Sequence, residues 1–128
     1  GEIYNCYLRE PVLFNGAGDM VLKLDEMCNW VGAPQSTTDY RFLNREMERQ
    51  YREDSARHPQ VSRDNLVYSI DCIPFQHALK AREVLVVYIK YRQNSSLQGS
   101  VRGRITKGEV VSFRSALELM RMVRMIQV

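Results

Sequence analysis

Apolar residues recur at helical spacing in the first half of the chain. Between positions 20 and 31 they return every three or four residues, and charged side chains occupy the positions between them. Asp19 stands where its carboxylate accepts hydrogen bonds from the free amides of a first helical turn, and Gly32 and Pro34 provide a stop. The pattern predicts an amphipathic helix whose methionines and cysteine fill the core.

A second amphipathic helix is expected at the C-terminus. Ser115 and Glu118 form the S-x-x-E pattern of a capping box, in which each side chain bonds the free backbone amide of the other. The apolar face that follows, from Leu117 to Ile126, is broad. We expect it to pack against the core, with part of its width as a candidate dimer contact.

The segment before position 57 is highly charged and favours a helix, but its apolar stripe is thin. The helix is expected to start between Ser36 and Asp39 and to end before His58. The stripe consists of Tyr40, Leu43, Met47 and Tyr51. Because so narrow a stripe covers little core, the helix at 38–56 either lies on the domain surface or docks onto another chain.

Several shorter segments favour other elements. Residues 3–9 are aromatic and end at Pro11, which predicts a short strand near a sheet edge. Residues 66–73 predict another strand, residues 74–82 a short helix, and residues 109–113 a returning strand.

A β-hairpin is the most informative prediction. The segments 84–93 and 97–106 alternate in polarity and flank Asn94-Ser95-Ser96, a cluster of turn formers. A three-residue loop pairs Gln93 with Leu97 and sets Tyr91 opposite Gly99, so that one face of the hairpin is apolar. The other face is then expected to carry a basic cluster: Tyr88, Lys90, Arg92, Arg102 and Arg104.

Together these elements predict one α+β domain over residues 1–128. Strands followed by a helix at each end imply an antiparallel sheet of three to five strands. The helix of the N-terminal half and the C-terminal helix would pack on one face of this sheet. The basic cluster would lie on the uncovered face.

The charge distribution supports an anion-seeking surface in the second half. The net charge is +3 over 128 residues, but residues 65–128 hold ten basic and four acidic side chains, whereas residues 1–44 hold three and six. A basic face of this kind fits nucleic acid or another anionic ligand.

The remaining chemistry argues against an enzyme. His58 and His77 are the only histidines, the three cysteines are far apart, and no glycine-rich phosphate loop is present. We therefore expect no catalytic residue, no metal site and no cofactor. No run reaches the roughly 18 apolar residues of a membrane helix, and the first residues lack a signal-peptide pattern, so we expect a cytoplasmic protein that does not associate with membranes.

Two resemblances add to this reading. The stretches Arg92-Gln93-Asn94-Ser95-Ser96-Leu97-Gln98-Gly99 and Phe113-Arg114-Ser115-Ala116-Leu117-Glu118-Leu119 resemble a group of small bacterial proteins, common in Firmicutes, that share R-Q-N-x-[ST]-x-Q-G and F-R-S-x-x-E-L motifs. That group has no assigned activity. The resemblance implies a bacterial, cytosolic origin. Leu97 stands where the group often has an aromatic residue.

The second resemblance is to PilZ domains, which are receptors for cyclic-di-GMP. Their signature is R-x-x-x-R followed by [DN]-x-S-x-x-G. Arg45 and Arg49 fit the first part, and Asn94, Ser96 and Gly99 fit the second. The resemblance implies that the two arginines clamp phosphates and a guanine edge while the turn presents small polar groups.

Two functions follow as hypotheses. The first is a small non-enzymatic binding or regulatory module that acts through protein contacts and self-associates. The alternative is a module that binds nucleic acid or an anionic ligand, including a cyclic dinucleotide, through the basic face of the hairpin at 84–106.

Overall fold

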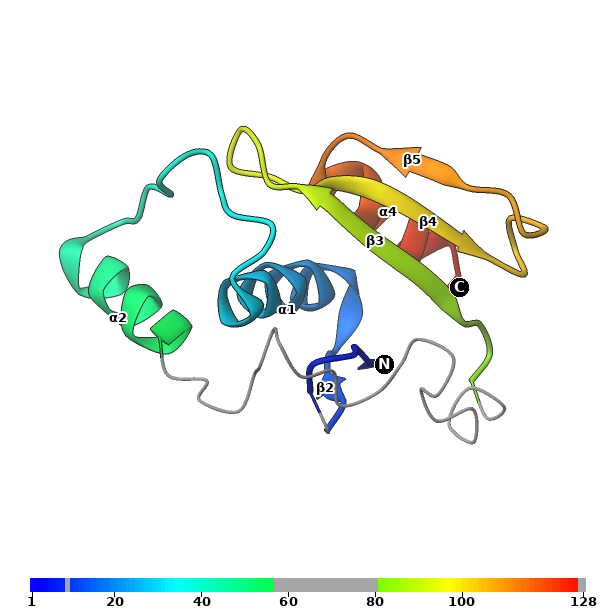
Figure 1. The fold of residues 1–128 in the computed structure, drawn as a ribbon, viewed down its shortest axis with the longest axis horizontal. Helices are drawn as coiled ribbons and strands as arrows, with labels where there is room; N and C mark the ends of the chain where they lie inside the picture. The colour runs from blue at the N-terminus through cyan, green and yellow to red at the C-terminus, as the bar shows by residue number, and fades with distance from the viewer. Residues whose placement is uncertain (9, 57–80, 127–128) are drawn as a thin grey trace.

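The computed structural model describes residues 1–8, 10–56 and 81–126 and shows an α+β fold. Its strands form a two-stranded antiparallel sheet, β1-β2, and a three-stranded antiparallel sheet in the order β3-β4-β5, which is drawn in yellow-green to orange in Figure 1. The strand expected at 66–73 and most of the helix expected at 74–82 lie outside these residues. The elements are β1 (Glu2–Ile3), β2 (Val12–Leu13), α1 (Gly16–Val31), α2 (Arg45–Ala56), β3 (Leu85–Tyr91), β4 (Gln98–Gly103), β5 (Val111–Phe113) and α4 (Ala116–Ile126).

The core lies between the three-stranded sheet and two helices. Its three most buried large side chains, each exposed by 2% or less, are Leu97, Phe113 and Leu119. Burial of one such side chain stabilises the fold by about 1.5–3 kcal/mol. The cluster is completed by Met20 and Leu24 of α1, Val101 of β4 and Val123 of α4. Both predicted amphipathic helices therefore pack on one face of the sheet, as expected.

The ends of the helices differ in detail from the prediction. Helix α1 begins at Gly16, three residues before Asp19, and the Asp19 carboxylate accepts a hydrogen bond from the Asn15 amide at 3.0 Å. Gly32 ends the helix as predicted, in the left-handed conformation with φ 81°. At α4, the Ser115 hydroxyl accepts from the Glu118 amide at 3.2 Å, but the Glu118 carboxylate accepts from the Arg114 amide, not from that of Ser115.

Two expected elements are much shorter than predicted. The N-terminal strand stops at Ile3 because the Asn5 side chain accepts hydrogen bonds from the amides of Tyr7 and Leu8, which bends the chain. Helix α2 starts at Arg45, not between Ser36 and Asp39, since the loop before it is tied to the hairpin by the Thr37 amide, which donates to the Arg92 carbonyl at 3.0 Å.

Helix α2 lies on the surface of the described part of the chain. It has no buried residue, and Figure 1 shows it beyond the end of α1 and away from the sheet. Its i,i+4 ion pairs Arg49–Glu53 and Arg52–Glu48 form at 3.0 and 2.9 Å. Such exposed pairs add only a few tenths of a kcal/mol each.

The hairpin forms, with a tighter turn than predicted. Asn94 and Ser95 both adopt the left-handed conformation, at φ 57° and 55°, and the Ser96 amide donates to the Gln93 carbonyl at 3.1 Å. This is a two-residue turn, typical of hairpins, where three loop residues were expected. The ladder pairs Ile89 with Gly99, so the register is two positions from the predicted one. From Leu85 to Ile89 this even shift leaves the side chains on the predicted faces.

Candidate functional site

The candidate site is the face of the three-stranded sheet that α1 and α4 leave uncovered. Side chains alternate between the two faces of a strand, and residues paired across strands share a face. Ile89 and Val101 point into the core, which places Tyr88 and its partner Ser100 on the uncovered face, together with Val86 and Arg102. Tyr88 is 62% exposed. We call this the open sheet face.

A β-bulge extends this face in a way the sequence did not predict. The ladder pairs Ile89 with Gly99 but Tyr91 with Gln98, so Lys90 is an extra residue on β3. A bulge of this kind reverses the alternation of the side chains that follow. Tyr91, which was expected on the apolar face, therefore joins the open sheet face, and it is 47% exposed.

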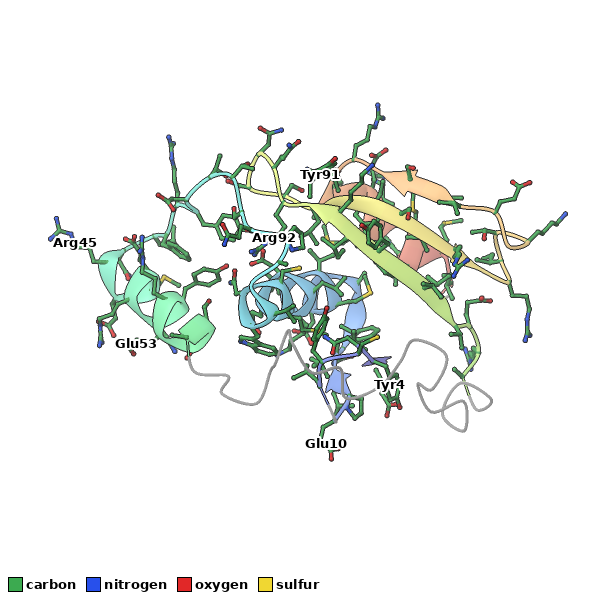
Figure 2. All side chains as sticks on the ribbon, viewed as in Figure 1. Tyr4, Glu10, Arg45, Glu53, Tyr91 and Arg92 are labelled. Carbon is green, nitrogen blue, oxygen red and sulfur yellow. The ribbon has the colours of Figure 1, made fainter. Side chains whose placement is uncertain are left out.

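Because of the same bulge, the face predicted for Arg92 is wrong. This residue was expected in the basic cluster on the open sheet face, but it points the other way, toward α1, and is only 3% exposed. Figure 2 shows Tyr91 and Arg92 on opposite sides of the end of β3. Compared with the predicted face, the open sheet face therefore has one more tyrosine and one arginine fewer.

The open sheet face carries cations as well as tyrosines. The Lys90 ammonium sits over the Tyr91 ring at 5.4 Å from the centroid. Arg102 is exposed on β4, and Arg104 is exposed in the turn that follows β4 and not in the ladder. Strands β3, β4 and β5 contain no aspartate or glutamate. The face is consequently basic without a carboxylate of its own strands to neutralise it.

Arg92 holds a buried polar cluster together. Its Nε donates to the Pro34 carbonyl at 2.7 Å, and its Nη1 donates to the Asp25 carboxylate at 3.0 Å and to the Asn29 side chain at 2.8 Å. The ion pair is sheltered, because the Asp25 side chain is only 13% exposed. Arg92 thus ties β3 to α1 and to the loop after it.

Two tyrosine hydroxyls complete the cluster. Tyr40 and Tyr51 both donate to the Asp25 carboxylate, the second at 2.8 Å. Burial, and next the hydrogen bond to Asp25, raise the pKa of Tyr40 to about 12, and the pKa of Tyr51 is raised mainly by burial. Both hydroxyls therefore stay protonated at neutral pH. Asn29 also donates to Tyr51 and to Ser55 of α2.

The residues of the PilZ-like pattern have other partners. Arg49 is bonded to Glu46 and Glu53 on its own helix, and Figure 2 shows Arg45 at the outer end of α2, pointing away from the sheet. The Ser96 hydroxyl accepts from the Ala116 amide at 2.8 Å and so caps α4. The structure does not bring Arg45 to the turn that holds Asn94.

Gly99 also has a structural role. A Cβ at this position would lie 1.8 Å from the backbone oxygen of Tyr88, so only glycine fits opposite the bulge. The close approach of the two strands at this point explains its presence without a ligand.

Sequence reasoning missed the buried cluster. Asp25 and Asn29 stand on the polar side of α1 and look solvated, whereas Tyr40 and Tyr51 were assigned to an apolar stripe. The available signal was the i,i+4 spacing of two short polar residues beside a helix stop, followed by tyrosines whose hydroxyls need partners when buried.

Three further results bear on the site. Within the described ranges, no cluster of three or more histidine, cysteine, aspartate or glutamate side chains is arranged to hold a metal ion. No helix in the described part of the chain has the length and apolar character needed to cross a membrane. No protein-family model, curated protein or solved structure matches the chain.

Proposed function

We propose that this protein is a non-enzymatic binding module whose open sheet face binds single-stranded nucleic acid. The observation that carries the proposal is the bulge at Lys90, which puts Tyr88 and Tyr91 on one face with cations between and beside them. The resemblance of residues 92–99 and 113–119 to small bacterial proteins supports the further proposal that this activity belongs to the cytoplasm of a bacterium.

The two tyrosines give the face its stacking capacity. They are three residues apart along β3, which corresponds to about 10 Å at about 3.3 Å per residue. Exposed aromatic rings on a sheet stack with bases of any sequence, and each base stacked contributes about 1–3 kcal/mol. Tyr88 at 62% and Tyr91 at 47% exposure are accessible for such contacts in the described structure.

The cations give the face its preference for a polyanion. Lys90 lies over the Tyr91 ring, Arg102 is paired with Val86 on the same face, and Arg104 follows in the adjoining turn. The three strands supply no competing carboxylate. A second copy of the chain stacked on this face would bring like charges together. The open sheet face therefore favours an anionic partner over self-association.

The test is a titration of a fluorescent oligothymidine of roughly twelve nucleotides, within the usual site size of such platforms. Binding should weaken as salt rises, with a log–log slope of about −2 for three phosphate contacts. Replacing both Tyr88 and Tyr91 by alanine should weaken binding at least about tenfold, because two stacking contacts are lost. The charge reversals Arg102→Glu and Arg104→Glu should abolish binding without changing the oligomeric state.

The matched control is Arg121→Glu, an exposed arginine of α4 outside the open sheet face. It changes the net charge as each reversal on the sheet does, and it should leave the affinity within about twofold of the wild type. The proposal is wrong if the oligonucleotide does not bind at low salt, or if the control weakens binding as much as the sheet variants do.

A second candidate function, contact with another protein chain through self-association, rests on a different surface. Leu117 and Met125 lie eight positions apart on α4 and are 55% and 75% exposed. Apolar residues eight positions apart lie on one broad helix face, so both side chains are available to the same partner. Sedimentation should show a dimer that Leu117→Gln with Met125→Gln converts to a monomer; a monomeric wild type would exclude this candidate.

A further inference from the structure

Three aromatic rings form part of the lining of an open hollow beside the buried cluster. Tyr40, Phe42 and Tyr51 line a space of about 400 Å³ between α2 and the loop before it. The Tyr51 ring contacts both of the others, with its centroid 5.7 Å from that of Tyr40 and 5.1 Å from that of Phe42. The planes are tilted by 55° and 43°, so the rings form walls and not a stack.

The cluster beneath the hollow fixes two of these rings. Tyr40 and Tyr51 donate their hydroxyls to the same Asp25 carboxylate, whose charge is held in place by Arg92. The ring positions are therefore set by side chains that are themselves largely buried. A site whose walls are positioned before a ligand arrives loses less entropy on binding.

The charges around the hollow distinguish between possible ligands. Asp39 lines it and is exposed, whereas the Arg52 guanidinium is bonded to Glu48 at 2.9 Å. The faces of aromatic rings attract cations, and a group of such faces is the arrangement that binds quaternary ammonium ions. A volume of about 400 Å³ lies within the usual range for small-molecule sites.

We propose that this hollow binds an organic cation of the quaternary ammonium type, with the three rings contacting its methyl groups and Asp39 at its rim. This site is separate from the open sheet face and does not depend on nucleic-acid binding there.

The experiment compares choline with 3,3-dimethyl-1-butanol, its neutral isostere, by calorimetric titration of the whole protein. Choline should bind at least roughly tenfold more tightly, because only the cation is attracted by the ring faces. Phe42→Leu should weaken choline binding by about tenfold while leaving an apolar side chain in place. Leu43→Ala, next in the chain and 90% exposed, is the matched control and should have no effect.

The charge variants test the sign of the ligand. Asp39→Asn should weaken choline binding several-fold and Arg52→Gln should strengthen it, and neither side chain is buried, so both variants should fold. Equal affinities for choline and the neutral isostere, no choline binding, or the opposite order of the two charge variants would each overturn the proposal.

Discussion

Replacing Arg92 by methionine removes the centre of the buried cluster and tests the assignment of its side chain. The change deletes the hydrogen bonds to Pro34 and Asn29 and the ion pair with Asp25. The Asp25 carboxylate would keep its two tyrosine donors but lose its counter-charge while its side chain is only 13% exposed. Breaking a buried pair in this way costs about 3–5 kcal/mol.

The position of Arg92 that the sequence pattern predicts implies a smaller change in the free energy of unfolding. On the open sheet face, where the sequence pattern put this residue, the same substitution would change the stability by less than about 0.5 kcal/mol. The free energy of unfolding from urea titration, followed by the fluorescence of Trp30, separates the two values. Lys90→Met is the control, since it removes a cation from the same strand on the exposed side, and it should cost less than about 0.5 kcal/mol.

Two further variants keep the test decisive if Arg92→Met does not fold. Arg92→Lys retains the charge but cannot reproduce the separate bonds to Pro34 and Asn29, and we expect a loss of about 1.5–3 kcal/mol. Asp25→Asn in the Arg92→Met background should recover stability, because it removes the unpaired charge. A loss below about 1 kcal/mol for both Arg92 variants would refute the buried assignment.

The remaining predictions concern pH and backbone space. The pKa of Tyr40 is raised from its ordinary 10.0 to about 12, so its contribution to stability is complete below pH 10 and is lost as the pH rises to 12. Tyr40→Phe should therefore reduce the fall in the free energy of unfolding between pH 10 and 12, measured by urea titrations. Gly99→Ala should destabilise the fold by more than about 2 kcal/mol, since its Cβ would lie 1.8 Å from a backbone oxygen. Gly18→Ala, with open space around it in α1, should instead raise the melting temperature through a gain of about 0.5–1 kcal/mol, and equal effects at the two glycines would contradict this account.

Much of the fold was accessible from local sequence patterns. The period of the apolar residues located α1 and α4, and the alternation at 84–93 and 97–106 located β3 and β4 and the side of each that packs on the core. These signals are reliable because burial of one face repeats along many residues. The end of α1 at Gly32 was equally predictable, since the left-handed conformation there suits glycine.

What escaped prediction depends on single residues and long-range contacts. The start of α2 was misplaced because its preceding loop is held by Arg92, 55 positions away from Thr37. The faces of Tyr91 and Arg92 were exchanged because a bulge adds one residue to the strand without changing its composition. Neither the long-range contact nor the bulge produces a repeating pattern of polar and apolar residues, so neither could be predicted from the sequence.

One extra residue at position 90 therefore shapes both of the proposed sites. If β3 continued without the bulge, Tyr91 would face the core and Arg92 the solvent, as the simple alternation predicts. The open sheet face would then have a single aromatic ring, and Asp25 would have no counter-charge beneath the hollow. The same insertion both builds the two-tyrosine platform and fixes the rings beside α2. The two proposed sites are thus chemically independent in what they bind but depend on one backbone irregularity for their geometry.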